Sequence, residues 1–225
     1  MERRERMADT GKTSLTPRTV IEAALSLADS EGLGAVTIRR LATDLGVTPM
    51  ALYWHFRNKD DLLDGMVDRI FEKIDPTVRT SDPWPEQLRT LLGSMLDVLR
   101  SHPSTAPLLS TRSATSESSL RITETLLDIL RRGGFSPTEA TQVARHALST
   151  LTNLVSAMPG SALGEESEDA QRRARVFLES LPPERYPRLV EAAVPLSECE
   201  DPEGYFAFGL DLLLAGIEAT ARRTG

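Results

Sequence analysis

The sequence has few of the residues that would place it among secreted, membrane or metal-cluster proteins. Cys199 is its only cysteine, which excludes an internal disulfide framework and any multi-cysteine metal site. No apolar run approaches the length of a membrane span, and the first residues, "MERRERMADTGK", lack the apolar centre of a secretion signal. We therefore expect a cytoplasmic protein with no membrane partner.

The sequence also lacks the motifs on which most enzymes depend. It has three histidines, and it contains no glycine-rich phosphate loop, no helix with paired carboxylates and no nucleophile elbow. We predict no catalytic residues, no metal site and no cofactor. An enzyme on a helical scaffold is kept only as a remote alternative.

Charge is distributed unevenly along the chain. The net charge is -7, but residues 1–59 carry nine Lys/Arg against seven Asp/Glu, and the remainder carries seventeen against twenty-six. A mildly basic amino-terminal part on an acidic remainder is compatible with a local DNA-binding surface, although it does not establish one.

Apolar residues recur at three- and four-residue spacing, and no convincing segment alternates at the period of a strand, so the sequence predicts an all-α fold. Four amino-terminal helices are expected, and capping residues mark the starts of three of them. The first is expected to bury Val20, Ile21, Ala24, Leu25 and Leu27 and to end at Gly32. The predicted caps are Thr16 before Pro17, Thr48 before Pro49, and Asn58, and the second helix is expected from about Thr37 to Leu45.

Three prolines among short polar residues in "DPTVRTSDPWPE" indicate a boundary near residue 75. We therefore expect a flexible basic arm over 1–15, a DNA-binding head over 16–74, and a ligand-binding and dimerisation body over 75–225. Within the body, "GSALGEESEDA" at 160–170 predicts a loop, and a last helix is expected from about 202 to 223.

The stretch "LGVTPMALYWHF" predicts a tight corner between two helices. Counted from Ile38 as position one, Ala42 falls at five, Gly46 at nine and Leu52 at fifteen. A small residue at five allows close helix approach, a glycine at nine adopts the left-handed conformation of the turn, and an apolar residue at fifteen packs the second helix. This spacing is typical of a helix-turn-helix, although an ordinary helical hairpin in a core would also fit it.

The residues around this corner resemble a known family. "TIRRLATDLGVTPMALYWHFRNKDDLLDGMVDRI" resembles the DNA-binding part of the TetR, or tetracycline-repressor-like, family of bacterial transcription regulators, and the match covers about residues 17–74. In the remainder, "STRSATSESSLRITETLLDILRRGGFSPTEA" is similar to the stretch around the drug pocket in carboxy-terminal domains of that family. The resemblance implies a helix-turn-helix head joined to a larger helical body.

The resemblance also implies roles for individual residues. Arg39 would reach a guanine edge, because its planar fork matches the two acceptors of guanine in the major groove. The tip of the second helix of the motif would face the bases, and further residues would hold phosphates. The base-facing tip is Thr48, Pro49, Met50 and Ala51, and the phosphate set is Thr37, Tyr53, His55 and Lys59.

Two further aromatic residues and the amino-terminal arginines have alternative roles. We expect Trp54 and Phe56 to pack in the core of the head rather than to contact DNA. The segment "RRER" at 3–6 could insert an arginine into an adjacent minor groove, but a terminus that only improves solubility is the favoured alternative.

Specific DNA binding needs two heads, so the body is expected to form a homodimer. The best candidates for the interface are the helices near 137–158 and near 202–223, which would form a four-helix bundle. In the last helix, Gly209 and Gly216 lie near one stripe with Leu212, Leu213 and Ala219. The two glycines would let a partner helix approach closely, or would serve only packing within one chain.

The resemblance further implies a small-molecule pocket in each body. No metal is expected in it, because two metal-ligand positions of the magnesium-dependent family members correspond here to Leu108 and Ala157, which lack oxygen or imidazole ligands. The candidate lining residues are Met95, Leu99, His102, Leu109, Arg112, Leu126, Phe135, His146, Asn153 and Phe177.

Taken together, these features predict a repressor that leaves a palindromic double-stranded DNA operator when a small-molecule effector binds. The alternative within the family is a regulator that activates transcription or has no small-molecule effector.

Overall fold

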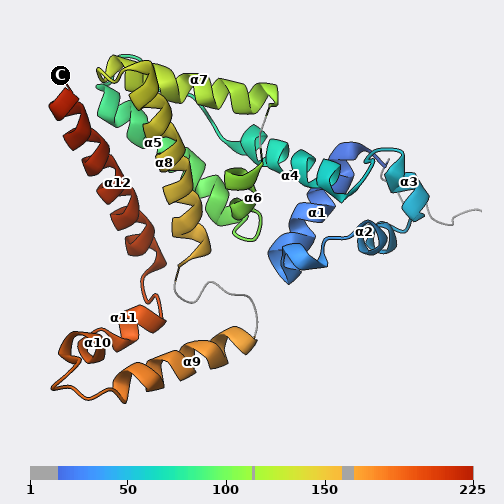
Figure 1. The fold of residues 1–225 in the computed structure, drawn as a ribbon. Helices are drawn as coiled ribbons and strands as arrows, with labels where there is room; N and C mark the ends of the chain where they lie inside the picture. The colour runs from blue at the N-terminus through green and yellow to red at the C-terminus, as the bar shows by residue number, and fades with distance from the viewer. Residues whose placement is uncertain (1–14, 113–114, 159–164, 225) are drawn as a thin grey trace, which may run out of the picture.

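The structure is a computed structural model that describes residues 15–112, 115–158 and 165–224, and all its regular elements in these ranges are helices. The predicted all-α fold is confirmed. Figure 1 shows a small group of helices at one end of an elongated molecule and a larger group at the other, with one helix reaching from the first group into the second. We call the small group the head and the larger group the body.

The head consists of four α-helices and one short 3-10 turn, η1 (Leu33–Ala35). The predicted caps at Thr16, Thr48 and Asn58 are present, and the structure adds a fourth at Thr37. Each of these side chains accepts a hydrogen bond from a backbone N–H three residues later. The helices of the head are α1 (Pro17–Glu31), α2 (Ile38–Asp44), α3 (Pro49–Tyr53) and α4 (Lys59–Lys73).

The body is built on longer helices around an apolar core. Its helix α8 starts with a capping box, in which Ser136 and Glu139 each accept a hydrogen bond from the other's backbone N–H. The long helices α5 and α12 pack against α8, and α7 packs against both α5 and α8. These helices are α5 (Trp84–Ser101), α6 (Ala106–Thr111), α7 (Glu117–Arg132), α8 (Pro137–Ser156) and α12 (Pro202–Thr224).

Three helices form a separate group beside the body, which lies below it in the view of Figure 1. They are α9 (Glu165–Glu179), α10 (Pro187–Glu191) and α11 (Ala193–Ser197), and they pack mainly against one another. Here one prediction is partly wrong. Residues 165–170, expected to lie in a loop, belong to α9, because the segment continues into the helix-forming run "QRRARVFLE". Residues 160–164 lie outside the described ranges.

The last helix is present as predicted, from Pro202 to Thr224, but it differs from the expectation that no apolar run approaches the length of a membrane span. Residues 202–222 of α12 are long and apolar enough to cross a membrane by length and composition, with a mean hydropathy of 1.2. The same test also selects core helices of soluble proteins. Phe206, Leu210, Leu214 and Ile217 are buried against the body, so the apolar character of α12 serves internal packing along one side.

The corner between α2 and α3 has the predicted geometry. Gly46 adopts φ +65° and donates its N–H to the carbonyl of Thr43, while the N–H of Val47 bonds the carbonyl of Ala42. This is the Schellman arrangement of a helix end, which needs a residue in the left-handed region. Ala42 and Leu52 are both buried, so the two helices pack closely as the spacing predicts.

We predict that Gly46→Ala lowers the free energy of unfolding by about 1 kcal/mol, because an L-residue at this φ is strained although the added methyl meets open space. Urea denaturation followed by circular dichroism measures the effect. Gly34→Ala is the matched control, since Gly34 is equally open but lacks a positive φ. Equal stability of the two variants would contradict the strain at the corner.

Candidate nucleic-acid interface

Helix α3 lies at the far end of the head (Figure 1), and its amino-terminal tip is exposed. Thr48 caps the helix through its hydroxyl, which accepts the N–H of Ala51 at 3.3 Å. Pro49 and Met50 follow on the surface, and the Met50 side chain is 67% exposed. The tip therefore presents short or apolar groups that can contact thymine methyls, on a helix of only five residues.

Two adjacent arginines on α2 have different environments. Arg40 donates to both carboxylate oxygens of Asp44 and also to Glu31, and the hydrogen bonds to Glu31 and then Asp44 raise its pKa. Arg39 is exposed, and within the described part of the chain no ion pair holds it. Arg39 is thus the arginine of this pair whose guanidinium is available to a base edge.

The residues with expected phosphate contacts are exposed or half-buried in the head. Tyr53 is 49% exposed, Lys59 is exposed at the start of α4, and His55 is half-buried between them in sequence. Thr37 is exposed as the cap of α2, where its hydroxyl oxygen accepts the N–H of Arg40. The exposed Arg57, which the sequence analysis did not select, adds a cation beside Lys59.

The expectation that Trp54 packs in the core is wrong. Its side chain is 84% exposed, whereas Phe56 is 5% exposed and belongs to the core as predicted. Leu52 and Phe56 are four residues apart and point inward, so Trp54, midway between them, points outward at the end of α3. Trp54 therefore joins Tyr53 on the same surface as the candidate DNA-contacting residues.

The possible arginine arm, residues 3–6, lies outside the described residues. Its contribution to the interface therefore stays a prediction.

The structure does not bring the ten predicted pocket residues together. Five of them lie in the core of the body, and five lie on or near the surface at four different places. The core residues are Met95, Leu99, Leu109, Leu126 and Phe135, of which Phe135 packs edge-on against Trp84. Of the others, His146 and Asn153 are exposed on α8, Phe177 is 63% exposed on α9, and His102 and Arg112 lie between head and body.

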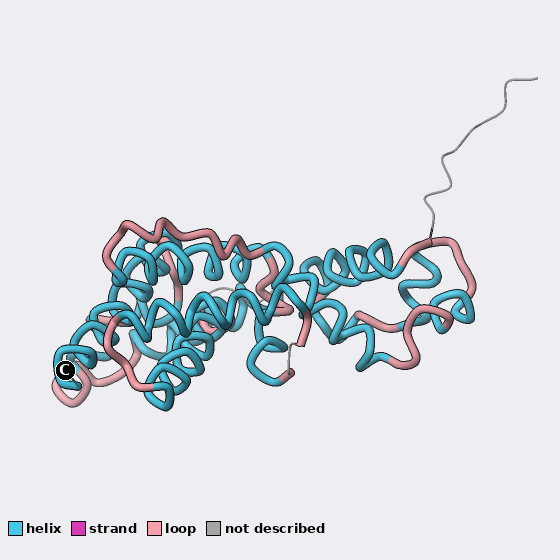
Figure 2. The backbone as a smooth tube through the Cα atoms, turned by 90° about the horizontal axis from the view of Figure 1, so that it is seen from above, coloured by secondary structure: helices cyan, strands magenta, loops and turns pink. Residues whose placement is uncertain are grey.

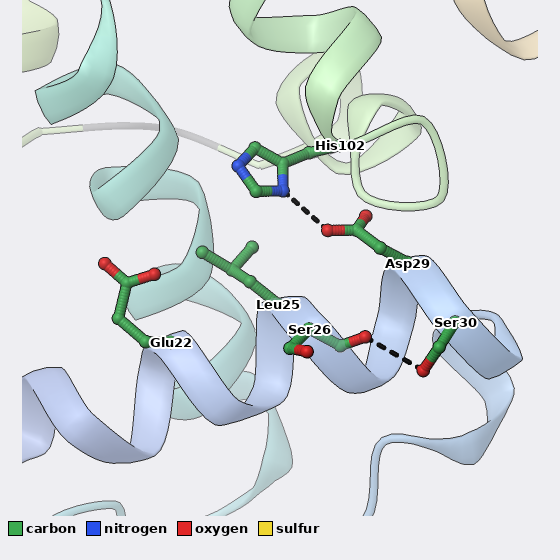
Figure 3. Close-up of a pocket in the computed structure, with 6 residues that line it drawn as sticks. All are labelled: Glu22, Leu25, Ser26, Asp29, Ser30 and His102. Carbon is green, nitrogen blue, oxygen red and sulfur yellow. Dashed lines mark hydrogen bonds and ion pairs between the residues drawn. The ribbon is translucent and has the colours of Figure 1, made fainter.

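His102 lines a shallow groove of about 450 Å³ between α1 and the end of α5, shown in Figure 3. Its Nε2 atom lies 3.0 Å from the ammonium of Lys73, which can only donate, so Nε2 accepts this hydrogen bond. The opposite ring nitrogen then carries the proton and donates to Asp29 at 2.7 Å. His102 is therefore held between α4 and α1 of the head rather than placed in the interior of the body.

Charged side chains continue this junction along α1 and α4. Burial alone would raise the pKa of Glu22, but its hydrogen bond to Arg69 and the charge of Lys73 outweigh burial and lower the pKa. Glu22 also forms ion pairs with both of these cations. The network ties α1 to α4 within the head.

Nothing in the described ranges resembles a metal centre. Among these residues there is no group of three or more His, Cys, Asp or Glu side chains that could hold a metal ion. Leu108, at one of the two positions that carry metal ligands in other family members, is buried. The expectation that a metal is not needed stays a prediction.

Comparison with known proteins gives matches over nearly the whole chain. Residues 20–66 match the family described as "Bacterial regulatory proteins, tetR family", and residues 77–221 match "Tetracyclin repressor-like, C-terminal domain". The tetracycline repressor protein class A from transposon 1721 of Escherichia coli is 31% identical over 91% of each chain.

Solved structures agree with this match. ActR of Streptomyces coelicolor in complex with actinorhodin is 27% identical, with a TM-score of 0.74 over 93% of this chain and 99% of ActR. BioQ with its double-stranded DNA operator is also 27% identical, with a TM-score of 0.61 over 92% of this chain and 99% of BioQ.

The contrast between Trp54 and Phe56 can be tested by stability. We predict that Phe56→Ala lowers the free energy of unfolding by about 3 kcal/mol or more, because it leaves a cavity in the core. Trp54→Ala should change it by less than about 0.5 kcal/mol, as expected for an exposed side chain. Urea denaturation measures both, and a large loss for Trp54→Ala would place this indole in the core after all.

Proposed function

The chain belongs to the TetR family of bacterial transcription regulators, and on that premise we propose that it is a repressor that binds a palindromic DNA operator as a homodimer and leaves it when a small molecule binds the body. The observation that carries the proposal is the exposed tip of α3, together with the exposed Arg39 on the neighbouring α2, which forms no ion pair with any residue that the structure describes. The matched relative from E. coli is named a repressor, and none of the reported relatives is named an enzyme.

Base recognition is assigned to Arg39 together with Thr48, Pro49, Met50 and Ala51. A short helix presented by its amino-terminal end can enter the major groove, where the fork of Arg39 matches guanine O6 and N7. Arg40 stabilises the base-recognition surface indirectly, because its ion pairs with Glu31 and Asp44 hold α2 against the end of α1.

Phosphate contacts are assigned to Thr37, Tyr53, His55 and Lys59. These contacts set the position of the head on the duplex without reading its sequence. Because the affinity from such contacts depends on counterion release, it should fall steeply with salt concentration.

The homodimer interface is assigned to α8 and α12. Between these helices runs a groove of about 550 Å³, lined in part by Val143, His146, Leu154 and Leu213. The outer side of α12 is apolar and uncovered, with Phe208 70% and Leu212 65% exposed. A second copy of the same surface would cover both features in a four-helix bundle.

The two glycines of α12 differ in their surroundings. A Cβ atom at Gly209 would lie 2.5 Å from the Leu154 side chain, so this glycine permits close packing of α12 on α8 within one chain. A Cβ at Gly216 would meet nothing within 4 Å. Gly216 is therefore the one of the two that is open to a partner helix.

The small-molecule effector is assigned to the body on the basis of the family. ActR, whose structure holds actinorhodin, is similar to this chain over head and body, and this likeness supports an organic effector here. The apolar candidates Met95, Leu99, Leu109, Leu126 and Phe135 lie together in the core cluster, where a ligand would have to displace packed side chains.

The DNA assignment predicts different effects for two neighbouring arginines. On duplexes selected by the unmodified protein from a random library, Arg39→Ala should cost about 1–3 kcal/mol and relax the preference at one base position of each half-site. Arg40→Ala is the matched control and should leave that preference unchanged. Fluorescence anisotropy with single-base operator variants measures both, and loss of preference in Arg40→Ala alone would contradict the assignment.

In the same assay, Lys59→Ala should weaken binding to all duplexes to a similar extent and reduce the slope of log affinity against log salt by about 1. A change confined to one base position would instead make Lys59 a base-reading residue.

The dimer assignment predicts that Leu212→Arg produces monomers at micromolar concentration. An unpaired charge buried in an apolar interface costs about 3–5 kcal/mol of association free energy. Sedimentation velocity measures the result. Leu120→Arg is the matched control, since Leu120 is 55% exposed on α7. An unmodified protein that sediments as a monomer would contradict the homodimer.

A further inference from the structure

The large apolar side chains that are exposed in the head, as described over residues 15–74, all belong to α3 or to the residue that ends it. They are Met50, Tyr53 and Trp54. The head lies at the opposite end of the molecule from the carboxy terminus, so the body leaves these side chains uncovered (Figures 1 and 2). Exposed apolar groups that gather in one place indicate a binding surface.

Two of these side chains share one face of the helical turn. Met50 and Trp54 are four residues apart, and the Trp54 N–H donates to the Met50 carbonyl at 3.3 Å. We call Met50 and Trp54 the α3 face. Met50 is nearer to the amino-terminal end of α3, which is the end assigned to the bases.

The first four residues of α3 carry no side chain that forms a strong hydrogen bond. They are Pro49, Met50, Ala51 and Leu52, and the thioether of Met50 is only a weak acceptor. Thr48 precedes them, and its hydroxyl oxygen accepts the N–H of Ala51. Apart from the hydroxyl proton of Thr48, the side chains at this end of α3 offer a base edge apolar contacts alone.

Hydrogen bonding to base edges is therefore left to α2, which packs against α3. Arg40 is held by Glu31 and Asp44, and the hydroxyl of Thr43 donates to the carbonyl of Arg39 at 3.1 Å. The guanidinium of Arg39 is exposed and forms no ion pair with a described residue. The two helices thus differ in chemistry, with hydrogen-bond donors on α2 and apolar groups on α3.

Only one apolar group is presented by the four bases in the major groove. It is the C5-methyl group of thymine, whereas the other base edges present hydrogen-bond donors and acceptors. In 5-methylcytosine the methyl group occupies the same ring position. An apolar side chain laid over any unmethylated edge would leave polar groups without partners, which is costly. Such a side chain favours a C5-methyl group and also disfavours the alternatives.

Met50 is the side chain of α3 that is best suited to this contact. It is exposed, and its three rotatable bonds and polarisable sulfur let it adapt to the position of a methyl group. Ala51 is only half-exposed and offers one methyl group, and the ring of Pro49 is rigid.

Positive charge near the α3 face indicates that its occupant is DNA. Arg57 and Lys59 follow Trp54 within five residues, and both are exposed without an ion pair to any described residue. The α3 face is also continuous in the chain with the surface assigned to DNA, because Met50 lies between Pro49 and Ala51.

We propose that Met50 recognises the C5-methyl group of a pyrimidine in the major groove, so that each operator half-site carries thymine or 5-methylcytosine at the base that Met50 covers. This inference rests on the proposed function and names the chemical group that α3 recognises. A methylated cytosine in the half-site would then strengthen binding in the way that thymine does.

The first experiment removes the methyl group and nothing else. In a duplex that the unmodified protein selects from a random library, each thymine of the half-site is replaced in turn by deoxyuridine, which keeps O4 and the base pair. At one position we expect binding about fourfold weaker, the factor for one methyl group lost from an apolar contact. Fluorescence anisotropy measures the affinities.

The same series with Met50→Ala assigns the contact to this side chain. The thymine and deoxyuridine duplexes should then bind equally, whereas Met50→Leu should keep the difference because leucine is also apolar. An effect of the methyl group on DNA shape would persist in Met50→Ala, and such persistence overturns the assignment. Leu120→Ala is the matched control, because it removes an exposed apolar side chain of α7 and should leave the difference unchanged.

A second series separates the methyl group from the rest of the thymine edge. The sensitive thymine–adenine pair is replaced by cytosine–guanine and by 5-methylcytosine–guanine. We expect the methylated pair to bind about fourfold more tightly than the unmethylated pair, which is the ratio expected for thymine over deoxyuridine. Equal binding of the two cytosine duplexes would show that the methyl group alone is not recognised, and would overturn the proposal.

Failure of this proposal is distinguishable from failure of the proposed function. If the unmodified protein selects a duplex and Arg39→Ala relaxes its base preference, but deoxyuridine is neutral at every thymine, Met50 does not recognise a methyl group and the proposed function stands. If the unmodified protein selects no duplex, the proposed function fails and the methyl contact fails with it.

Discussion

The burial of α4 between head and body is the constraint on which the rest of the structure depends. Six of its side chains are buried, and they join the apolar core of the head to that of the body in one connected cluster. The buried residues are Leu62, Leu63, Met66, Val67, Ile70 and Phe71. Packed cores adopt discrete arrangements rather than deforming continuously. Any reorientation of α4 on the body would therefore move the head as a unit.

Polar contacts then decide which orientation α4 adopts. Arg112 and His102 lie at opposite ends of α4, and both pair with groups of the head. The carboxylates that Arg112 contacts are exposed, and pairs of this kind typically contribute only about 0–1 kcal/mol, so the Arg112 contact is a poor explanation of why the chain folds. A contribution of that size is nevertheless sufficient to bias an equilibrium between two orientations of a rigid head.

The sequence predicted the local structure of the head well, because each feature depends on residues close together in the chain. The caps at Thr16 and Asn58 and the left-handed Gly46 follow from rules that act over three to five residues. The choice between Arg39 and Arg40 was made from family resemblance, and only the positions of Glu31 and Asp44 supply a physical reason for it.

Predictions failed or stayed untested where contacts between residues distant in sequence determine the position of a side chain. Trp54 was expected in the core because aromatic residues usually are, but the faces of a five-residue helix cannot be assigned from composition. His102 and Arg112 were selected as polar residues in an apolar body. Their partners are distant in sequence, so no local pattern could have shown that both face the head.

The distribution of charge explains why the orientation of the heads should matter so much. Residues 60–225 carry an excess of acidic side chains, so the body is repelled by DNA and only the head can approach it. Residues 1–59 are only slightly basic, with nine Lys/Arg against seven Asp/Glu, which leaves a single head with weak, salt-sensitive affinity. In the proposed dimer, binding of one head raises the effective concentration of the other, but only if both can engage together. The small excess of positive charge in residues 1–59 therefore makes operator binding by the proposed dimer depend on both heads engaging at once.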